Sequence, residues 1–252
     1  MTKIAFITDL HIPLEGLAPL GLNPLSQFKE ALAHAVAGRP DIIIIGGDLS
    51  NREPIPYANR VTHELLSETG IPFLIIAGNH DRPEQLSEEF SLTLKNGELY
   101  YLHELPEEEI MILDSSSKRI SKHQLDWMSR MLKKKDTINK IFIHHPLSIT
   151  GIPFMDKNHA LENREEVMTC LSQVDRKLYV FSGHCHASRV IHGHHFTQYI
   201  TPSTYLQISE QAEDFLIDHT QPGYRFIEIG ETGTIITHLH YPGLEDQSDA
   251  VG

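Results

Sequence analysis

Short apolar segments rich in β-branched residues alternate with amphipathic segments in the N-terminal third of the chain. Residues 3–8, 41–45 and 72–77 have the length and branching of buried strands, whereas residues 25–36 and 57–68 repeat apolar side chains at helical spacing. Strands that alternate with helices in this way predict βαβ units and a mostly parallel sheet.

The order of elements changes after residue 94. Short strands near residues 100–102 and 110–113 are typical of a hairpin. Ser121 is expected to cap a helix that ends at residue 134, with Gln124 as the partner in a capping box. A strand over 140–143, a helix over 161–174 and a strand over 178–181 follow, and later strands are expected at 189–192, 196–201, 224–229 and 234–239. We therefore expect one α/β domain over residues 1–240, with two sheets back to back and helices outside, and a disordered tail over 241–252.

Composition limits the partners that the chain can have. Its 252 residues include 21 basic and 34 acidic side chains, a formal charge of −13, and the cluster of lysines at 133–135 is expected at the solvated end of a helix. Long nucleic acid is therefore not expected as a partner. No apolar run approaches the roughly 20 residues of a membrane span, and no signal peptide is evident, so we expect a cytoplasmic protein without membrane contact. Two cysteines, Cys170 and Cys185, suit a reducing compartment.

Polar side chains follow five of the predicted strands at the points where the strands end. The five blocks are Asp9-Leu10-His11, Gly46-Gly47-Asp48, Gly78-Asn79-His80-Asp81, His144-His145-Pro146 and Gly183-His184-Cys185-His186. Because the carboxyl ends of parallel strands meet in one crevice, we expect these blocks to lie together. Oxygen and imidazole donors without thiolate suit Mn, Fe, Zn or Co in an open site. Six or seven ligands are too many for one such ion, so the blocks predict two ions that share a carboxylate.

The spacing within the blocks predicts how the side chains point. Alternate residues of an extended chain share a face, so Asp9 should point with His11, and His184 with His186. Cys185 then points the other way, into packing. The glycines at positions 46, 47, 78 and 183 let the backbone turn or approach closely just before each ligand.

In this order, D-x-H, G-D, G-N-H-D, H-H-P and G-H-x-H resemble the motifs of the calcineurin-like metallophosphoesterase superfamily. The blocks spread from residue 9 to residue 186, and none of the five is missing. The resemblance implies a four-layer αββα sandwich, in which two mixed β-sheets pack face to face with helices outside. It also implies a metal-dependent phosphoric diester hydrolase with two transition-metal ions, Fe, Mn, Zn or Co.

The resemblance also implies a role for each position. One metal would be held by Asp9, His11, Asp48 and His186, and the other by Asp48, Asn79, His144 and His184. Asp48 would then bridge the two ions. Either histidine of the 144/145 pair could supply the fourth ligand of the second metal. An H-x-P pattern in the family favours His144, which leaves His145 as a neighbour or a substrate contact.

A hydrolytic mechanism follows from two such ions. Ions about 3.5–4 Å apart clamp a phosphoryl group and lower the pKa of a bridging water, whose hydroxide attacks phosphorus in line with the leaving oxygen. His80 is expected to donate a hydrogen bond or a proton to the substrate, and a third ligand is its alternative role. The catalytic residues would be His80, Asp48 and Asn79. Asp81 could orient the neighbouring imidazole or contact the substrate.

Segments outside the five blocks narrow the substrate. Bacterial class III 3′,5′-cyclic nucleotide phosphodiesterases have C-terminal strands that residues 202–207, 214–218 and 222–226 resemble. Their segment between the fourth and fifth blocks is similar to Met155-Asp156 and residues 161–163. The resemblance implies hydrolysis of a cyclic nucleotide such as cAMP to the 5′-nucleotide. His159 and Asn163 are candidates to contribute near the mouth of the site, at positions that the sequence does not specify. A glycerophosphodiesterase or broad-specificity phosphodiesterase is the alternative. A catalytically inactive metal-binding scaffold is the alternative of another class, and family members of that kind usually lose ligands.

The remaining histidines have simpler interpretations. The sequence His192-Gly193-His194-His195 is expected to form a solvated hairpin turn rather than a metal site. Four histidines are expected on the surface, and two on a solvent-facing edge strand: His34, His63, His103 and His123, and then His238 and His240. A homodimer would use the domain's own surface or the last strands, because the chain has no large insertion.

Overall fold

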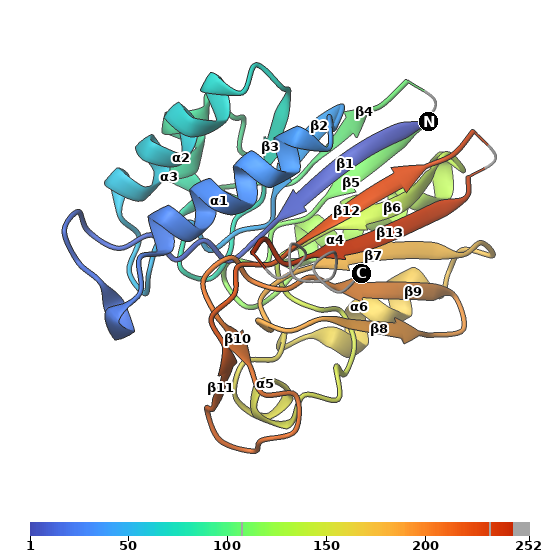
Figure 1. The fold of residues 1–252 in the computed structure, drawn as a ribbon. Coiled ribbons are helices and arrows are strands. Elements are labelled where there is room, and N and C mark those ends of the chain that lie inside the picture. The colour runs from blue at the N-terminus through green and yellow to red at the C-terminus, as the bar shows by residue number, and fades with distance from the viewer. Residues whose placement is uncertain (107, 232, 244–252) are drawn as a thin grey trace, which may run out of the picture.

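Two β-sheets lie face to face in the middle of the molecule, and helices cover the outer face of each sheet (Figure 1). The computed structural model describes residues 1–106, 108–231 and 233–243. Its arrangement is the four-layer αββα sandwich that the sequence implied. Most of the predicted tail, residues 244–252, lies outside the described residues, so the prediction of a disordered tail stays a prediction.

The first sheet has the strand order β13-β12-β1-β2-β3. Its strands are β1 (Thr2–Ile7), β2 (Ile42–Ile45), β3 (Phe73–Ile75), β12 (Tyr224–Ile229) and β13 (Ile235–His240). The neighbours β1, β2 and β3 run parallel, as the alternation with helices predicted, whereas β12 and β13 are antiparallel additions. Three helices cover its outer face: α1 (Pro24–Ala37), α2 (Pro56–Glu68) and α3 (Pro83–Phe90).

The second sheet has the strand order β4-β5-β6-β7-β9-β8. Its strands are β4 (Tyr101–Glu104), β5 (Glu109–Ile112), β6 (Ile138–Phe142), β7 (Leu178–Ser182), β8 (Arg189–His192) and β9 (Phe196–Ile200). The inner four run parallel, and β4 and β8 are antiparallel edge strands. Its outer face is covered by α4 (Lys122–Lys134) and α6 (Arg164–Leu171).

Strand alternation divides the apolar side chains among the layers. Ile4 and Phe6 of β1 face the second sheet, and the Phe6 ring meets Phe142 edge-on at 5.4 Å between centroids. Ala5 and Ile7, between and after them, belong to the cluster under α1. Full burial of such side chains contributes about 1.5–3 kcal/mol each, so the sheets are held together along their whole length.

A buried arginine also joins the two sheets. Arg225 of β12 donates to the Thr201 hydroxyl at 3.2 Å and to the Ile200 carbonyl at 2.8 Å, both at the end of β9 in the second sheet. It also donates to the Thr237 hydroxyl of β13 at 3.0 Å. Burial lowers the pKa of Arg225 to about 10, which leaves it charged at neutral pH. The two sheets are therefore fixed in register near the ends of their strands.

Short elements differ most from the sequence predictions. The Ser121 hydroxyl does cap α4 by accepting from the Gln124 main chain at 3.2 Å. No capping box forms, because the Gln124 side chain bonds the main chain of Asp114 instead. The helix expected over 161–174 is the shorter α6, and His103 lies in β4 rather than in a helix or loop. The sequence did not indicate α5 (Pro153–Asn158), η1 (Pro19–Gly21) or the two-stranded sheet of β10 (Gln207–Ile208) and β11 (Ile217–His219).

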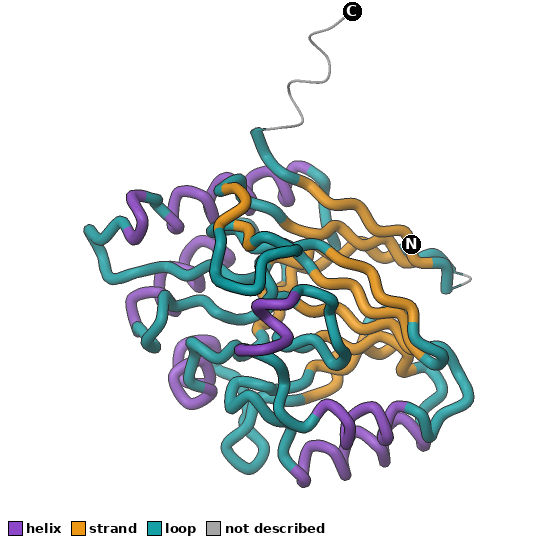
Figure 2. Tube along the Cα trace, turned by 90° about the horizontal axis from the view of Figure 1, so that it is seen from below, coloured by secondary structure: helices purple, strands orange, loops and turns teal. Residues whose placement is uncertain are grey.

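Loops gather at the end of the molecule where the parallel strands stop (Figure 2). The helix α5 and the β10–β11 pair lie at this end (Figure 1). A small apolar cluster anchors them there, with Ile152, Met155 and Ile208 packed against Cys185 of the last polar block. Cys185 is 1% exposed and therefore packed, as its place between two outward ligands predicted.

Candidate metal centre

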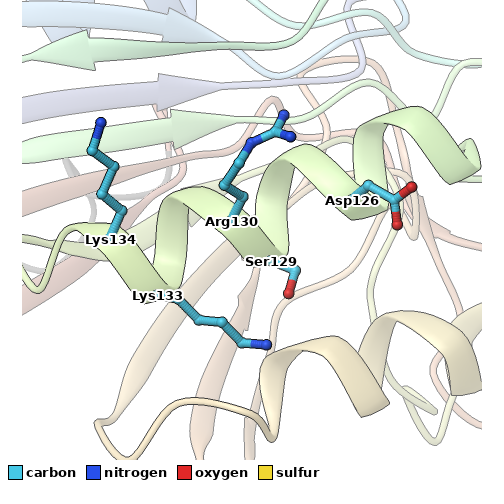
Figure 3. A pocket seen from close by; sticks show the side chains of 5 residues that line it. All are labelled: Asp126, Ser129, Arg130, Lys133 and Lys134. Atoms are coloured by element: carbon cyan, nitrogen blue, oxygen red, sulfur yellow. The ribbon is translucent and has the colours of Figure 1, made fainter.

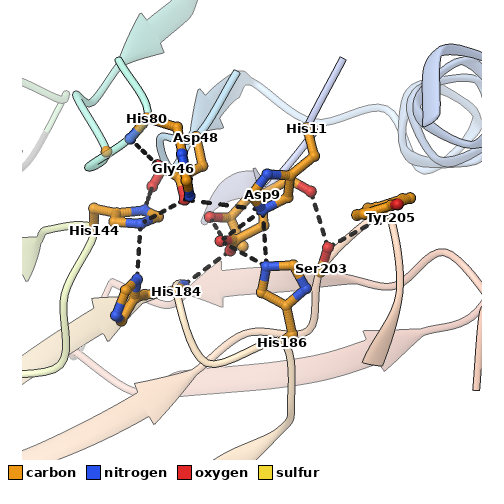
Figure 4. Close-up of polar contacts among 12 residues, drawn as sticks. Asp9, His11, Gly46, Asp48, His80, His144, His184, His186, Ser203 and Tyr205 are labelled. Atoms are coloured by element: carbon orange, nitrogen blue, oxygen red, sulfur yellow. Dashed lines mark hydrogen bonds and ion pairs between the residues drawn. The ribbon is translucent and has the colours of Figure 1, made fainter. Parts of the chain in front are cut away.

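The five polar blocks of the sequence meet at the carboxyl ends of β1, β2, β3, β6 and β7 (Figure 4). Two of these strands belong to the second sheet and three to the first, so the site lies across the seam between the sheets. Four overlapping groups of side chains each bring their ligand atoms within 4.8 Å of one another. The prediction that topology brings these blocks together is confirmed.

One group consists of Asp9, His11 and His186. The Nε2 atoms of His11 and His186 lie 2.8 Å apart, and His186 Nε2 lies 3.4 Å from Asp9 Oδ1. All three side chains are buried, with 6% exposure for His11 and 8% for His186. Figure 4 shows the two rings and the carboxylate pointing to a common space.

A second group consists of His144, His145 and His184. His144 Nε2 lies 3.2 Å from His184 Nδ1 and 3.3 Å from Asp48 Oδ2. The same Asp48 oxygen lies 3.8 Å from His11 Nε2 of the first group. Asp48 therefore stands between the two groups, in the position that a shared carboxylate requires.

Two buried oxygens test whether metal ions fit this site. Asp9 Oδ1 and Asn79 Oδ1 are buried without a hydrogen-bond partner among the described residues. An interior acceptor that lacks a donor costs roughly 1–3 kcal/mol. Both oxygens belong to residues that the sequence assigned as metal ligands. Carboxylate, amide and imidazole donors without thiolate are also the set that two divalent transition-metal ions would accept, so the residues present fit the ions.

Main-chain carbonyls orient three of the imidazoles. His144 Nδ1 contacts the Gly46 carbonyl at 2.8 Å, and His186 Nδ1 contacts the Leu206 carbonyl at 2.9 Å. His184 Nε2 contacts the His159 carbonyl at 2.8 Å. A ring nitrogen that donates to a carbonyl leaves the opposite nitrogen bare, which is the usual support of a metal-binding histidine. The support turns His144 Nε2 toward Asp48, whereas the Nδ1 of His145 faces the Ser115 hydroxyl.

The backbone of the ligand residues differs from the prediction. Sequence spacing implied extended chain at the ligands, but β1 ends at Ile7 and β7 at Ser182. Five ligand residues have positive φ angles between 47° and 69°: Asp9, His11, Asp48, His184 and His186. Their shared direction therefore comes from tight turns and not from strand alternation. Hydrogen bonds impose these turns. The His11 main chain donates to the Asp48 carbonyl, and the His184 main chain donates to the Asp9 carboxylate.

All four predicted glycines permit close approach, because a Cβ added to Gly46, Gly47, Gly78 or Gly183 would lie 2.7 Å or less from a neighbouring atom. A Cβ added to Gly78 would lie 2.2 Å from Asp48 Oδ1, and one added to Gly183 would lie 2.5 Å from Asp9 Oδ2. Such contacts are far below those that real side chains make. The two ligand carboxylates therefore occupy the space that any larger residue at these positions would need.

Burial and charge pull the pKa values of the site in opposite directions. Burial alone would raise the pKa of Asp48, but the charge of His144 overcomes it and holds that pKa well below its ordinary value. Burial alone would lower the pKa of His144, but the Asp48 carboxylate raises it to about 10. Burial, reinforced by the charges of His186 and His144 respectively, lowers the pKa values of His11 and His184 to about 3. One proton is thus held between His144 and Asp48, and the other two rings are neutral.

His80 lies on the open side of the site. Its side chain is 29% exposed, whereas the ligand imidazoles are nearly closed to solvent. The His80 main chain donates to Asp48 Oδ1 at 2.8 Å, and its Nδ1 contacts the Arg52 carbonyl at 2.5 Å. Its Nε2 lies 3.8 Å from Asp48 Oδ2. The ring is therefore fixed beside the shared carboxylate and remains accessible to a substrate.

The structure separates the other residues named from the sequence. Asp81 is buried, and its carboxylate accepts from the main chains of Leu49 and Gly78 at 3.0 and 2.9 Å, so it joins two ligand-bearing turns. Burial and the nearby Asp48 raise its pKa to about 7. Asn163 is buried, and its amide bonds both main-chain groups of Ile120.

Sequence reasoning missed the groups that support the ligands. The carbonyls of Gly46, Leu206 and Arg52 act through main-chain atoms, which carry no residue-type signal. Ser203 was also missed as a support, although its hydroxyl donates to the Asp9 carbonyl at 2.9 Å. Its place in the C-terminal segment at residues 202–207 was the available signal.

Other clusters in the described part of the chain do not resemble this site. A shallow depression on the outer face of α4 is lined by Asp126, Ser129, Arg130, Lys133 and Lys134 (Figure 3). Lys133 and Lys134 are exposed, as expected for a solvated helix end. His192 and His194 are exposed at the β8–β9 turn, as predicted. Among the described helices, none has both the length and the apolar character needed to span a bilayer.

Comparisons with known proteins agree with this geometry. A probable cyclic nucleotide phosphodiesterase of Fibrobacter succinogenes is 31% identical over 231 residues, which cover 91% of this chain and 90% of that protein. The 3′,5′-cyclic adenosine monophosphate phosphodiesterase CpdA of Escherichia coli is 27% identical over 252 residues and covers 94% of this chain and 89% of its own. A dimetal phosphatase from Danio rerio shares the fold, with a TM-score of 0.66 at 13% identity over 96% of this chain and 99% of that one.

The family model described as calcineurin-like phosphoesterase matches residues 2–188. This range includes all five polar blocks and ends just after His186, the last of the predicted ligands. The resemblance drawn from the motifs is therefore confirmed, and the chain belongs to the calcineurin-like phosphoesterase family.

Proposed function

We propose that this protein is a dinuclear-metal phosphodiesterase that hydrolyses 3′,5′-cyclic nucleotides, cAMP in particular, to 5′-nucleotides. The observation that carries the proposal is Asp48, whose Oδ2 lies 3.3 Å from a histidine of one ligand group and 3.8 Å from a histidine of the other. Two donor sets that share one carboxylate support two ions, and two ions are suited to phosphoryl transfer.

We assign the ligands as two sets of four. The first set is Asp9, His11, Asp48 and His186, and the second is Asp48, Asn79, His144 and His184. When bound, the ions would polarise the phosphoryl group and make a water nucleophilic at neutral pH. The native metals are proposed from the donor set to be among Fe, Mn, Zn and Co.

The residues of the chain supply orientation and a donor. The three carbonyls that receive imidazole hydrogens keep the facing ring nitrogens bare, and the burial of the ligands excludes bulk water. His80 is proposed to donate from Nε2 to the phosphoryl group or to the leaving 3′ oxygen. This role requires that His80 be accessible to substrate, and its partial exposure supports that. It also requires a fixed ring, which the contact with the Arg52 carbonyl supports.

The choice of a cyclic nucleotide rests on the names of two relatives and on the C-terminal segment. The relatives from Fibrobacter succinogenes and Escherichia coli cover about nine tenths of this chain, so their likeness includes both sheets. The segment that resembles class III enzymes lies against the first ligand set, with the Tyr205 ring centroid 5.6 Å from that of His11. Glycerophosphodiesters remain the alternative substrates, because the ligand sets would treat both kinds of diester alike.

An inactive metal-binding scaffold is the less favoured reading. The ligand atoms converge, and His80 stands beside them with a free approach from solvent. A scaffold would have no need for an accessible donor at this position. A cytoplasmic location is also proposed, since the substrate is intracellular and the free cysteines Cys170 and Cys185 are buried as thiols.

A substrate panel tests the proposal. Metal-free protein would be reconstituted with Mn²⁺ and assayed on 3′,5′-cAMP, 2′,3′-cAMP, glycerophosphodiesters, an aryl diester and monoesters. We expect 3′,5′-cAMP to give the highest kcat/KM and 5′-AMP as product. If glycerophosphodiesters gave the highest kcat/KM, they would replace cAMP as the proposed substrate. A preference for monoesters would contradict the proposal that the protein is a phosphodiesterase. Absence of turnover in protein with two bound metals would favour the inactive metal-binding scaffold.

A further inference from the structure

His145 is a fully buried imidazole with a ring nitrogen within 4.8 Å of ring nitrogens of His144 and His184, and the two proposed ligand sets leave it without a role. Its side chain is 0% exposed, and its Nδ1 lies 2.9 Å from the Ser115 hydroxyl. The main chain of His145 also donates to this hydroxyl at 3.1 Å. Its Nε2 is buried without a hydrogen-bond partner among the described residues. A buried polar nitrogen left unpaired is costly, so the ring needs a compensating purpose.

The ring of His145 packs against the ring of His184. Their centroids lie 4.1 Å apart with an angle of 36° between the planes, which is the closest approach among the ring pairs of the described residues. The neighbouring His144 ring is 5.1 Å away and nearly perpendicular. The His145 ring therefore covers one face of the His184 ring.

The polar contacts of His184 hold its two nitrogens but not its faces. Its Nε2 lies 2.8 Å from the His159 carbonyl and its Nδ1 lies 3.2 Å from His144 Nε2, and these contacts leave the ring free to rock about the line between the two nitrogens. The His145 ring lies over one face and blocks that motion. The two contacts together define the direction in which His184 Nδ1 points.

The two supports of His184 are also tied to each other. The main chain of Lys118 donates to the Ser115 carbonyl at 2.8 Å and closes a turn beside the hydroxyl that anchors His145. The main chain of Glu162 donates to the Lys118 carbonyl at 2.9 Å. This second bond links the turn to the segment that presents the His159 carbonyl. The His145 ring and the His159 carbonyl, which contact His184, are therefore connected to each other by main-chain hydrogen bonds.

We propose that His145 is a positioning residue that holds the His184 imidazole by ring stacking and is not itself a metal ligand, with Ser115 as its anchor. The proposal rests on the assignment of His184 to the second metal in the proposed function. Groups that orient a ligand from behind typically change metal affinity by about 10–100-fold when they are lost. The flat face of the ring is the active feature, so an aromatic ring without nitrogen should serve as well.

The test compares two apolar substitutions of similar bulk, His145→Phe and His145→Leu. Metal-free wild type, both variants and a His123→Ala control, which changes an exposed histidine of α4, would be titrated with Mn²⁺ and with Co²⁺. We expect two sites in the wild type. His145→Phe should keep the affinity of the second site within about threefold, and His145→Leu should weaken that site about 10–100-fold without changing the first.

The outcomes distinguish a failure of the stacking proposal from a failure of the proposed function. Equal loss in both variants would show that a nitrogen of His145 is required, which overturns stacking. Equal affinity in both variants would show that the flat ring has no effect, which also overturns it. A wild type that binds fewer than two ions would reject the proposed function instead. If His145→Leu does not fold, His145→Met, which also lacks a flat ring, takes its place, and an unchanged second site in that variant would overturn the proposal.

Discussion

The Nε2 atoms of His11 and His186 face each other at 2.8 Å, although the two residues are 175 positions apart. His186 directs its Nδ1 to the Leu206 carbonyl, so its Nε2 is the bare nitrogen of the ring. Two imidazole nitrogens bound at right angles to one ion, each at about 2.1 Å, would be about 3 Å apart. The chain thus holds these rings at the separation that a common ion requires.

Asp48→Ala should remove both metals. The Asp48 carboxylate lies between the two ligand groups, so its loss takes one ligand from each. We expect the metal content to fall from about two ions to less than one, and kcat to fall at least about 10³-fold. Elemental analysis and steady-state kinetics would measure both, with the exposed Asp218→Ala as control. Retention of two ions would contradict the bridging role.

His80→Ala should leave the metals in place and slow turnover. The ring touches the site through Nε2 on the open side, and the contact of its main chain with Asp48 survives the substitution. Loss of one positioned donor lowers kcat by about 10²–10³-fold, with a smaller change in KM. The control is His123→Ala, which removes a solvent-exposed ring. Should His80→Ala empty one metal site, the side chain would be a ligand instead.

Metal binding should release at least one proton near pH 8. In the metal-free protein the pKa of His144 is raised to about 10, so the ring is protonated at pH 8, whereas a metal ligand must be neutral. His11 and His184, with pKa values of about 3, contribute no proton there. The affinity for Mn²⁺ should therefore rise about tenfold per pH unit between pH 6.5 and 9, and this contribution should vanish above pH 10. Calorimetry in buffers of different ionisation enthalpy would count the protons, and a flat profile below pH 9 would contradict the assignment.

Gly183→Ala should damage the metal centre more than the fold. The added Cβ would lie 2.1 Å from the Thr8 hydroxyl and 2.5 Å from Asp9 Oδ2, so the carboxylate must move. We expect metal affinity to fall about 10–100-fold, and the free energy of unfolding to fall by about 1–3 kcal/mol. Gly230→Ala is the matched control, because its Cβ would meet nothing closer than 3.7 Å. Equal affinities in the two variants would show that the close approach has no effect on the ligand.

The sequence predicted the elements that long apolar runs define. β1, β2, β6 and β7 are buried strands whose ends carry the ligands, and a general rule of parallel sheets then places those ends together. The candidate ligand residues could be named because aspartate, asparagine and histidine are side chains that bind metal ions. The resemblance to a family fixed which of them share an ion and favoured His144 over its neighbour.

Other features depend on contacts that no local pattern encodes. α5 has six residues and β10 has two, which is too short for a period to show. The positive φ angles of Asp9 and His184 result from hydrogen bonds to distant turns, so strand alternation was the wrong model for their direction. The main-chain carbonyls that contact the imidazoles could not be predicted from the sequence, because every residue has a carbonyl.

Five of the proposed ligand residues hold a left-handed backbone, which is strained for side chains other than glycine. Glycine at any of these positions would relieve the strain and remove a proposed metal ligand. Such a variant should therefore resist heat at least as well as the wild type while binding metal less tightly.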